Sequence, residues 1–241
     1  MSVIKKGDFV KIEYTGKVKS DDYIFDTTSK EVATNNGIFN SQATYGPVTV
    51  CIGTSMVIKG LEDALIGKEL GFEGVVDVPA DDAFGKKDPK LLKLIPTSKF
   101  KKHNVNPQPG LQVDVDGSIG FVRTVTGGRT IVDFNHPLSG KELEYNVKIL
   151  NKVSDLKEQI SSILTMKLNL KPDNYIVDVV EKEAKITLKG LPEVPEEVSS
   201  KISEFITSYV DVEKVQFIPD KEFTDSDKNS KKNNSEEDNA E

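Results

Sequence analysis

The stretch Val57-Ile58-Lys59-Gly60-Leu61-Glu62-Asp63-Ala64-Leu65-Ile66-Gly67 decides the fold of this chain. Its apolar residues recur at spacings of three and four, which places them on one face of a helix, and Gly67 suits the helix end. Period-two alternation predicts one strand before this helix, over 47–52, and another after it, over 71–79. A helix this short is not stable alone, so we expect it to lie across a sheet that buries its apolar face.

The composition restricts the class of protein. The chain has 241 residues, 37% of them hydrophobic, which suffices for one to three domains with packed cores. It has no run of ~18 apolar residues that could span a membrane, and its first residues lack the apolar core of a signal peptide, so we expect a cytoplasmic protein. A net charge of −7 argues against nucleic acid as the main partner. The single cysteine, Cys51, falls within a predicted strand and is expected to be a small buried apolar residue in preference to a reactive thiol.

Five short motifs surround the helix in a fixed order. They are Tyr14-Thr15-Gly16, Phe25-Asp26, Tyr45-Gly46-Pro47, Pro79-Ala80-Asp81-Asp82-Ala83-Phe84-Gly85 and Leu143-Glu144-Tyr145-Asn146-Val147. Together with 57–62, this pattern over residues 7–150 resembles the FKBP-type peptidyl-prolyl cis-trans isomerases. An insertion that ends in Asn135-His136-Pro137-Leu138-Ser139-Gly140-Lys141 is similar to the insert-in-flap arrangement of SlyD-like and archaeal members. The additional carboxy-terminal segment resembles that of the long archaeal type.

The resemblance implies an α+β fold with four parts. An FKBP-like antiparallel sheet wrapped on a short helix takes residues 1–85 plus 135–152, and a small β domain, the insert-in-flap chaperone domain, takes 86–134. A C-terminal α+β domain follows over 153–220, and a tail over 221–241 is too polar to offset the entropy of ordering. The segment 30–44 shows little periodicity and is predicted to be a long excursion within a strand.

The insertion is predicted to hold three short strands after Pro107-Gln108-Pro109-Gly110, because alternating apolar residues are separated there by Asp116-Gly117 and Gly127-Gly128. About fifty residues provide little core. Two alternatives follow for its apolar residues: they are partly exposed, which suits capture of unfolded chains, or the core of the insertion consumes them all. The residues concerned are Leu94, Ile95, Phe100 and Phe121.

The C-terminal segment predicts the element order αββαβ. Ser154 is the expected N-cap of a first helix with Leu156, Ile160, Ile163 and Leu164 on one face. A hairpin over 175–180 and 184–188, a helix over 196–209 and a strand over 212–218 follow. The second helix is expected to turn five residues inward, namely Val198, Ile202, Phe205, Ile206 and Tyr209. A domain of roughly 65 residues is marginal alone, which makes it a candidate dimerisation unit.

The resemblance to FKBP-type isomerases also implies the site. The catalytic residues would be Tyr14, Asp26, Ile58, Phe84 and Tyr145, and the substrate-binding residues Phe25, Val48, Val50, Val57 and Leu61. Asp26 would supply the polar edge and orient the Tyr14 hydroxyl, with a backbone carbonyl as the alternative partner of that hydroxyl. The backbone N–H of Ile58 would hold the substrate carbonyl. Phe84 stands where many members have a tyrosine, and Leu61 where eukaryotic members often have a tryptophan, so tight binding of macrolide drugs is not expected.

The implied activity is peptidyl-prolyl cis-trans isomerisation with no cofactor, no metal and no covalent intermediate. The partners would be unfolded or partly folded proline-containing polypeptides, with a homodimer through the C-terminal domain. The main rival is a holdase-type chaperone with only slight isomerase activity. An RNA-binding role for the C-terminal domain is a more distant rival, because that segment has no glycine-loop clamp, aromatic sheet motif or basic stripe.

Overall fold

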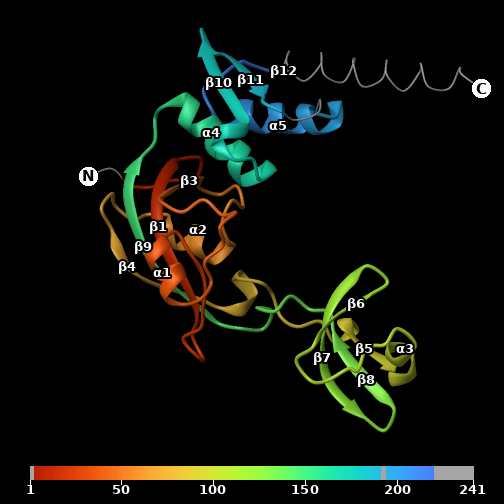
Figure 1. The fold of residues 1–241 in the computed structure, drawn as a ribbon. Coiled ribbons are helices and arrows are strands. Elements are labelled where there is room, and N and C mark those ends of the chain that lie inside the picture. The colour runs from red at the N-terminus through yellow and green to blue at the C-terminus, as the bar shows by residue number, and fades with distance from the viewer. Residues whose placement is uncertain (1–2, 191–193, 220–241) are drawn as a thin grey trace, which may run out of the picture. The chain divides into compact units, whose positions relative to one another are not determined.

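The structure is a computed structural model that describes residues 3–190 and 194–219 (Figure 1). The described residues form two compact units. The first comprises residues 3–15, 26–76, 146–190 and 194–219, and the second residues 16–25 and 77–145. The fold is of the α+β class, as predicted from the sequence. Within the described ranges, no helix combines the length and the apolar composition that crossing a bilayer requires.

A five-stranded sheet contains the strands of the FKBP-like motifs. Its order is β2-β1-β9-β4, with β3 paired antiparallel with β1. The strands are β1 (Phe9–Val18), β2 (Ile24–Thr27), β3 (Val48–Cys51), β4 (Glu73–Val78) and β9 (Leu143–Lys152). The predicted helix is present as α2 (Lys59–Leu65), with Ile58 as its N-cap and with Gly67 at a φ of 82°. Leu61 and Leu65 are buried on α2, so the apolar face of this short helix is packed as expected.

The excursion predicted over 30–44 lies between β2 and β3 and begins with a helix that was not predicted. Helix α1 (Lys30–Asn35) begins after Ser29, whose hydroxyl accepts a hydrogen bond from the Val32 N–H. Only Ala33 is buried on this helix, and six residues with one buried position show no helical period in the sequence. Beyond α1, the rings of Phe39 and Tyr45 stack at a centroid distance of 5.5 Å.

The inserted segment forms a four-stranded antiparallel sheet in the order β5-β8-β7-β6. Its elements are β5 (Leu92–Pro96), α3 (Thr97–Lys102), β6 (Gln112–Val115), β7 (Ser118–Thr126) and β8 (Arg129–Asp133). The three predicted strands are present as β6, β7 and β8, whereas β5 and α3 were not predicted. Ile95 and Phe100 belong to the core, while Leu94 is 58% exposed and Phe121 half-buried. The alternative in which the core consumes all four residues is therefore wrong, and Leu94 and Phe121 are the two that are partly exposed.

The C-terminal segment has the predicted αββαβ order. Its elements are α4 (Leu156–Leu168), β10 (Tyr175–Val180), β11 (Glu183–Leu188), α5 (Glu196–Tyr209) and β12 (Lys214–Pro219). The predicted N-cap Ser154 is wrong, because Asp155 accepts the hydrogen bond from the Glu158 N–H. Val198 and Tyr209 were predicted to point inward but are exposed, which leaves Ile206 as the fully buried anchor of α5. The tail over 221–241 lies outside the described residues.

Helix α4 packs against β3, within the first unit. Glu158 accepts a hydrogen bond from the Thr49 hydroxyl at 3.0 Å and pairs with Lys11 at 2.6 Å. At the other end of α4, the Lys167 ammonium donates to the Thr54 carbonyl at 2.7 Å. The C-terminal segment therefore has a packing partner within its own chain. The four-part division of the chain and its pairing with a second copy stay predictions.

Candidate functional site

The predicted polar edge is present in the first unit. The Tyr14 hydroxyl on β1 donates to the Asp26 carboxylate on β2 at 2.8 Å. The backbone holds this pair in place, because the Thr28 N–H donates to the Tyr14 carbonyl and the Tyr14 N–H donates to the Thr28 hydroxyl. Asp26 is exposed and Tyr14 half-buried, so the hydroxyl and the carboxylate lie at the border between protein and solvent.

The turn before α2 presents the predicted substrate donor. Ile58 has an extended backbone, and its carbonyl accepts from the N–H groups of Leu61 and Glu62. Among the described residues, its own N–H donates no hydrogen bond, so this donor remains available to a ligand carbonyl. Glu62 is only 5% exposed and accepts from the Met56 N–H at 3.0 Å, which fixes the turn. Glu62 was not among the site residues predicted from the sequence.

The remaining predicted substrate-binding residues of the first unit lie on β3, on α2 and just before α2. Val48 and Val50 alternate with Thr49 on β3 and therefore share one face of the strand. Val50 is fully buried, Val48 half-buried, and both pair with β1 in register. Val57 is half-buried directly before α2, and Leu61 is 1% exposed on the helix. They contribute apolar area and carry no charge.

Three predicted residues form an aromatic cluster in the second unit. The Phe25 ring meets Phe84 at a centroid distance of 6.3 Å and Tyr145 at 5.8 Å, both edge to face. Gly16 makes this packing possible, because a Cβ there would lie 2.8 Å from atoms of both the Phe25 and the Tyr145 rings. Since aromatic pairs prefer this edge-to-face geometry, the cluster holds Phe84 in a defined place.

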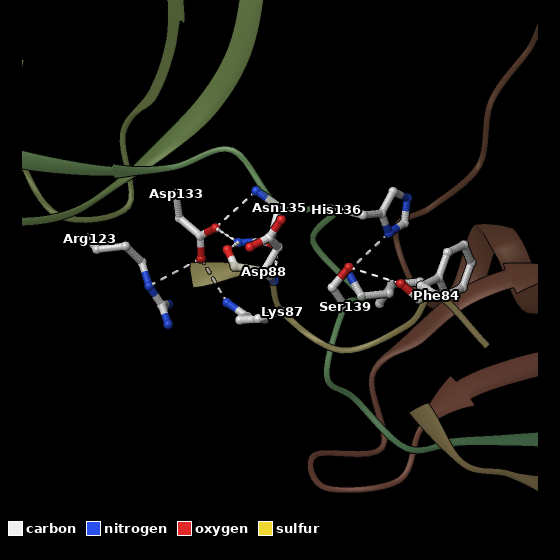
Figure 2. Close-up of polar contacts among 9 residues, drawn as sticks. Phe84, Lys87, Asp88, Arg123, Asp133, Asn135, His136 and Ser139 are labelled. Carbon is white, nitrogen blue, oxygen red and sulfur yellow. Dashed lines mark hydrogen bonds and ion pairs between the residues drawn. The ribbon is translucent and has the colours of Figure 1, made fainter. Parts of the chain in front are cut away.

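His136 extends this cluster and was not among the predicted site residues. Its ring stacks on Phe84 with centroids 4.4 Å apart and planes 4° apart. Ser139 donates from its hydroxyl to the Phe84 carbonyl at 3.0 Å, and Figure 2 shows both residues on the segment that returns from the insertion. The only sequence signal was the position of His136 within the closing motif 135–141.

A polar junction joins the two segments that lead into and out of the inserted sheet (Figure 2). Asp133 is buried, and its carboxylate accepts from Lys87 at 2.8 Å and from the side-chain amide of Asn135 at 2.8 Å. Asn135 also exchanges two hydrogen bonds with the backbone of Asp88. Burial alone would raise the pKa of Asp133, but the hydrogen bonds from Lys87 and Asn135 outweigh it and lower the pKa to about 2.

The ten predicted site residues therefore form smaller groups within their units. Seven lie in the first unit and three, Phe25, Phe84 and Tyr145, in the second. Phe25 and Asp26 are consecutive residues of β2. A separate cavity of about 600 Å³ in the first unit is lined by charged and hydroxyl side chains and contains only Tyr14 of the ten. No group of three or more potential metal ligands occurs among the residues that the structure describes.

Comparison with known proteins decides the family. A family profile described as "FKBP26, IF domain" matches residues 93–138. The short-type peptidyl-prolyl cis-trans isomerase of Methanocaldococcus jannaschii is 36% identical over 149 residues, which are 62% of this chain and 94% of that protein. This chain belongs to the FKBP-type peptidyl-prolyl cis-trans isomerases. The FKBP resemblance seen in the sequence motifs is thereby confirmed.

A second relative supports the same assignment. The FKBP-type isomerase SlyD of Treponema pallidum is 33% identical over 132 residues, 53% of this chain and 74% of that protein. Among solved structures, the chain is similar to the three FKBP domains of wheat FKBP73, with 17% identity and a TM-score of 0.34, over 64% of this chain and 42% of that chain.

Proposed function

We propose that this chain catalyses cis-trans isomerisation of X-Pro peptide bonds in unfolded or partly folded cytoplasmic polypeptides. The observation that carries the proposal is the aromatic cluster of Phe25, Phe84 and Tyr145 in a chain that belongs to the FKBP-type isomerases. Three residues that the family resemblance singled out from distant parts of the sequence pack on one another. Their packing supports a shared role in holding an apolar substrate side chain.

The chemistry requires positioning and an apolar surface. Resonance gives the prolyl C–N bond partial double-bond character, so uncatalysed rotation takes tens of seconds or longer. Twisting this bond makes the amide less polar, and an apolar, water-poor surface therefore favours the twisted state over the planar one. In the proposed mechanism, the half-buried rings of Phe25 and Phe84 supply that surface, and no covalent bond is made or broken.

Polar groups orient the substrate in this proposal. The Ile58 N–H holds the substrate carbonyl, since it donates no hydrogen bond within the described chain. Asp26 fixes the Tyr14 hydroxyl at 2.8 Å and provides the polar edge. His136 stacks on Phe84 and thereby restricts the ring of that residue. Because Phe84 has no hydroxyl, it contributes apolar area, worth about 2 kcal/mol when buried, instead of a hydrogen bond.

The activity is tested by isomerisation of a proline tetrapeptide. Asp26→Ala and Phe84→Ala are each expected to lower turnover by roughly tenfold or more. A tenfold loss corresponds to ~1.4 kcal/mol of transition-state stabilisation. Asp173→Ala and Phe39→Ala are matched controls, because they change an exposed aspartate and an exposed phenylalanine outside the predicted site. Unchanged turnover in both site variants would show that the site has been misplaced.

The inserted sheet supports a second, chaperone function. Leu94 on β5 lies directly opposite Ile131 on β8, and Leu92 lies two residues along the same strand, so all three share one face of the sheet. They are 58%, 36% and 42% exposed, respectively. Exposed apolar side chains gathered on one face are typical of interaction surfaces. We propose that this face binds apolar segments of unfolded chains.

The chaperone function separates from isomerisation in one variant. Leu94→Ser is expected to weaken suppression of aggregation while leaving tetrapeptide turnover unchanged. Leu70→Ser is the control, because it replaces another exposed leucine with serine, in the first unit and outside the inserted sheet. Acceleration of proline-limited refolding distinguishes the isomerase from the rival holdase. A pure holdase would suppress aggregation without accelerating the slow phase.

A homodimer through the C-terminal segment also stays a proposal. Ile176 and Ile218 flank Thr187 in one row across β10, β11 and β12, and both isoleucines are exposed. Such a row offers apolar area to a second copy. Size-exclusion chromatography with light scattering tests it, and a monomer at every accessible concentration would refute it.

A further inference from the structure

The inserted segment carries a charge opposite to that of the rest of the chain. Residues 86–134 contain seven lysines and two arginines against four aspartates and no glutamate, a net charge of +5. The whole chain has a net charge of −7, so the remaining residues together carry −12. A basic module on an acidic protein attracts anionic ligands to that module in preference to the rest of the surface.

A groove of about 300 Å³ on the inserted sheet combines an apolar floor with part of this charge. Its floor consists of Leu91, Leu94, Ile95, Val115 and Phe134. Lys93 on β5 and Lys99 on α3 also line the groove and are exposed. Its volume suits one or two apolar side chains, while a flanking group of the same ligand would reach the lysines.

The two lysines are not neutralised from within the protein. Within the described residues, neither Lys93 nor Lys99 forms an ion pair, whereas Lys86 pairs with Asp81 and Lys87 with Asp133. The Lys93 ammonium lies 5.6 Å from the centroid of the Phe134 ring, which places its charge beside the apolar floor. Asp116 is the one carboxylate among the lining residues. Two lysines against one aspartate leave the groove with a net positive charge.

We propose that this groove binds segments of unfolded polypeptide in which an apolar residue is flanked by aspartate or glutamate. The proposal rests on the chaperone function proposed for the inserted sheet and adds a charge preference to it. Apolar contacts would supply affinity, and the lysines would select against lysine- and arginine-rich segments. A polypeptide fits better than a nucleic acid, because the only aromatic residue of the floor, Phe134, is half-buried beneath Lys93, which leaves little aromatic surface for base stacking.

The test measures fluorescence anisotropy of labelled peptides with the full chain. Two peptides share one apolar core, and their flanks are aspartates in the first and lysines in the second. Lys93→Gln/Lys99→Gln removes the charges of the groove, and Lys101→Gln/Lys102→Gln is the matched control, since it removes the same charge from exposed positions of the same module outside the groove. Thermal unfolding confirms that both variants fold.

The acidic peptide is expected to bind roughly fivefold more tightly than the basic one at low salt, from two exposed charge pairs. The groove variant should lose that preference, the control variant should retain most of it, and high salt should reduce it in the parent chain. Equal affinity for both peptides overturns the charge preference and leaves the chaperone function standing, while binding of neither peptide overturns both. An equal loss of the preference for the acidic peptide in the two variants would assign the effect to net charge alone and would overturn the role of the groove. Tighter binding of a single-stranded RNA than of the acidic peptide would make this a nucleic-acid surface and would also overturn the proposal.

Discussion

Replacing Asp133 by asparagine tests the polar junction at the base of the inserted sheet. The carboxylate of Asp133 is 7% exposed, lies 2.8 Å from the Lys87 ammonium and accepts two hydrogen bonds from Asn135. Asparagine has nearly the same shape, but it is neutral and would turn either an amide donor or a weaker acceptor toward Lys87. The substitution therefore removes the charge and leaves the packing nearly unchanged.

The structure gives the magnitude of the effect. Lowering the pKa from its ordinary value of 3.8 to about 2 corresponds to about 2 kcal/mol of stability at neutral pH. Because the pKa is lowered on folding, this stability is present above the unfolded pKa and is lost as pH falls from roughly 4 to 2. Lys87 is 38% exposed and can regain water when its partner is neutralised, so we expect about 2 kcal/mol and not the larger cost of a fully buried charge left unpaired.

Amide hydrogen exchange measures this loss in the full chain. At neutral pH, protection of amides in β7 and β8 is expected to fall by roughly thirtyfold in Asp133→Asn, the equivalent of ~2 kcal/mol. The free energy of unfolding of the parent chain, measured with urea, should fall as the pH is lowered from 4 to 2. The variant should lack this part of the pH dependence. Asp114→Asn is the control, because it changes an exposed aspartate of the same sheet whose amide oxygen can still accept from the Gly117 N–H. Equal protection in the parent chain and in Asp133→Asn would refute the stabilising role of the junction.

Two further substitutions and one labelling experiment have defined outcomes. Gly16→Ala should displace the Phe25 and Tyr145 rings, cost about 1–3 kcal/mol and lower turnover, which calorimetry and the tetrapeptide assay measure; an unchanged melting temperature would contradict the close approach at this glycine. Cys51 should resist alkylation at pH 8 in the folded chain, because burial raises its pKa to about 11, and rapid labelling under native conditions would contradict this. Leu164→Ala on α4 should destabilise the chain by about 2–5 kcal/mol in urea unfolding, and a loss below ~1 kcal/mol would show that its site collapses or is loosely packed.

The sequence predicted elements with many periodic residues and missed the short ones. Helix α5 was predicted with both boundaries correct, since fourteen residues show the helical period clearly. Helices α1 and α3 have six residues each and one buried position each, so no period was visible. The first three residues of β5, Leu92, Lys93 and Leu94, are all exposed and its only buried residue is Ile95, which hides the alternation of a strand.

The candidate site was predictable where it repeats family motifs. The hydrogen bond from Tyr14 to Asp26 was expected, because its residues belong to ordered motifs on adjacent strands. The stacking of His136 on Phe84 was not, since the two residues are 52 positions apart with the whole insertion between them. The N-cap was assigned to Ser154 because serine is a frequent cap, yet Asp155 satisfies the same rule one residue later.

The packing of α4 on β3 allows release of the C-terminal segment to be followed in solution. Thr49 and Cys51 share the face of β3 that α4 covers, and Lys167 reaches the Thr54 carbonyl just beyond that strand. The accessibility of Cys51, the sole thiol of the protein, therefore reports whether the C-terminal segment is packed on the five-stranded sheet. If the segment detaches while the sheet stays folded, the sulfur becomes accessible, and its labelling rate would record each release without any engineered probe.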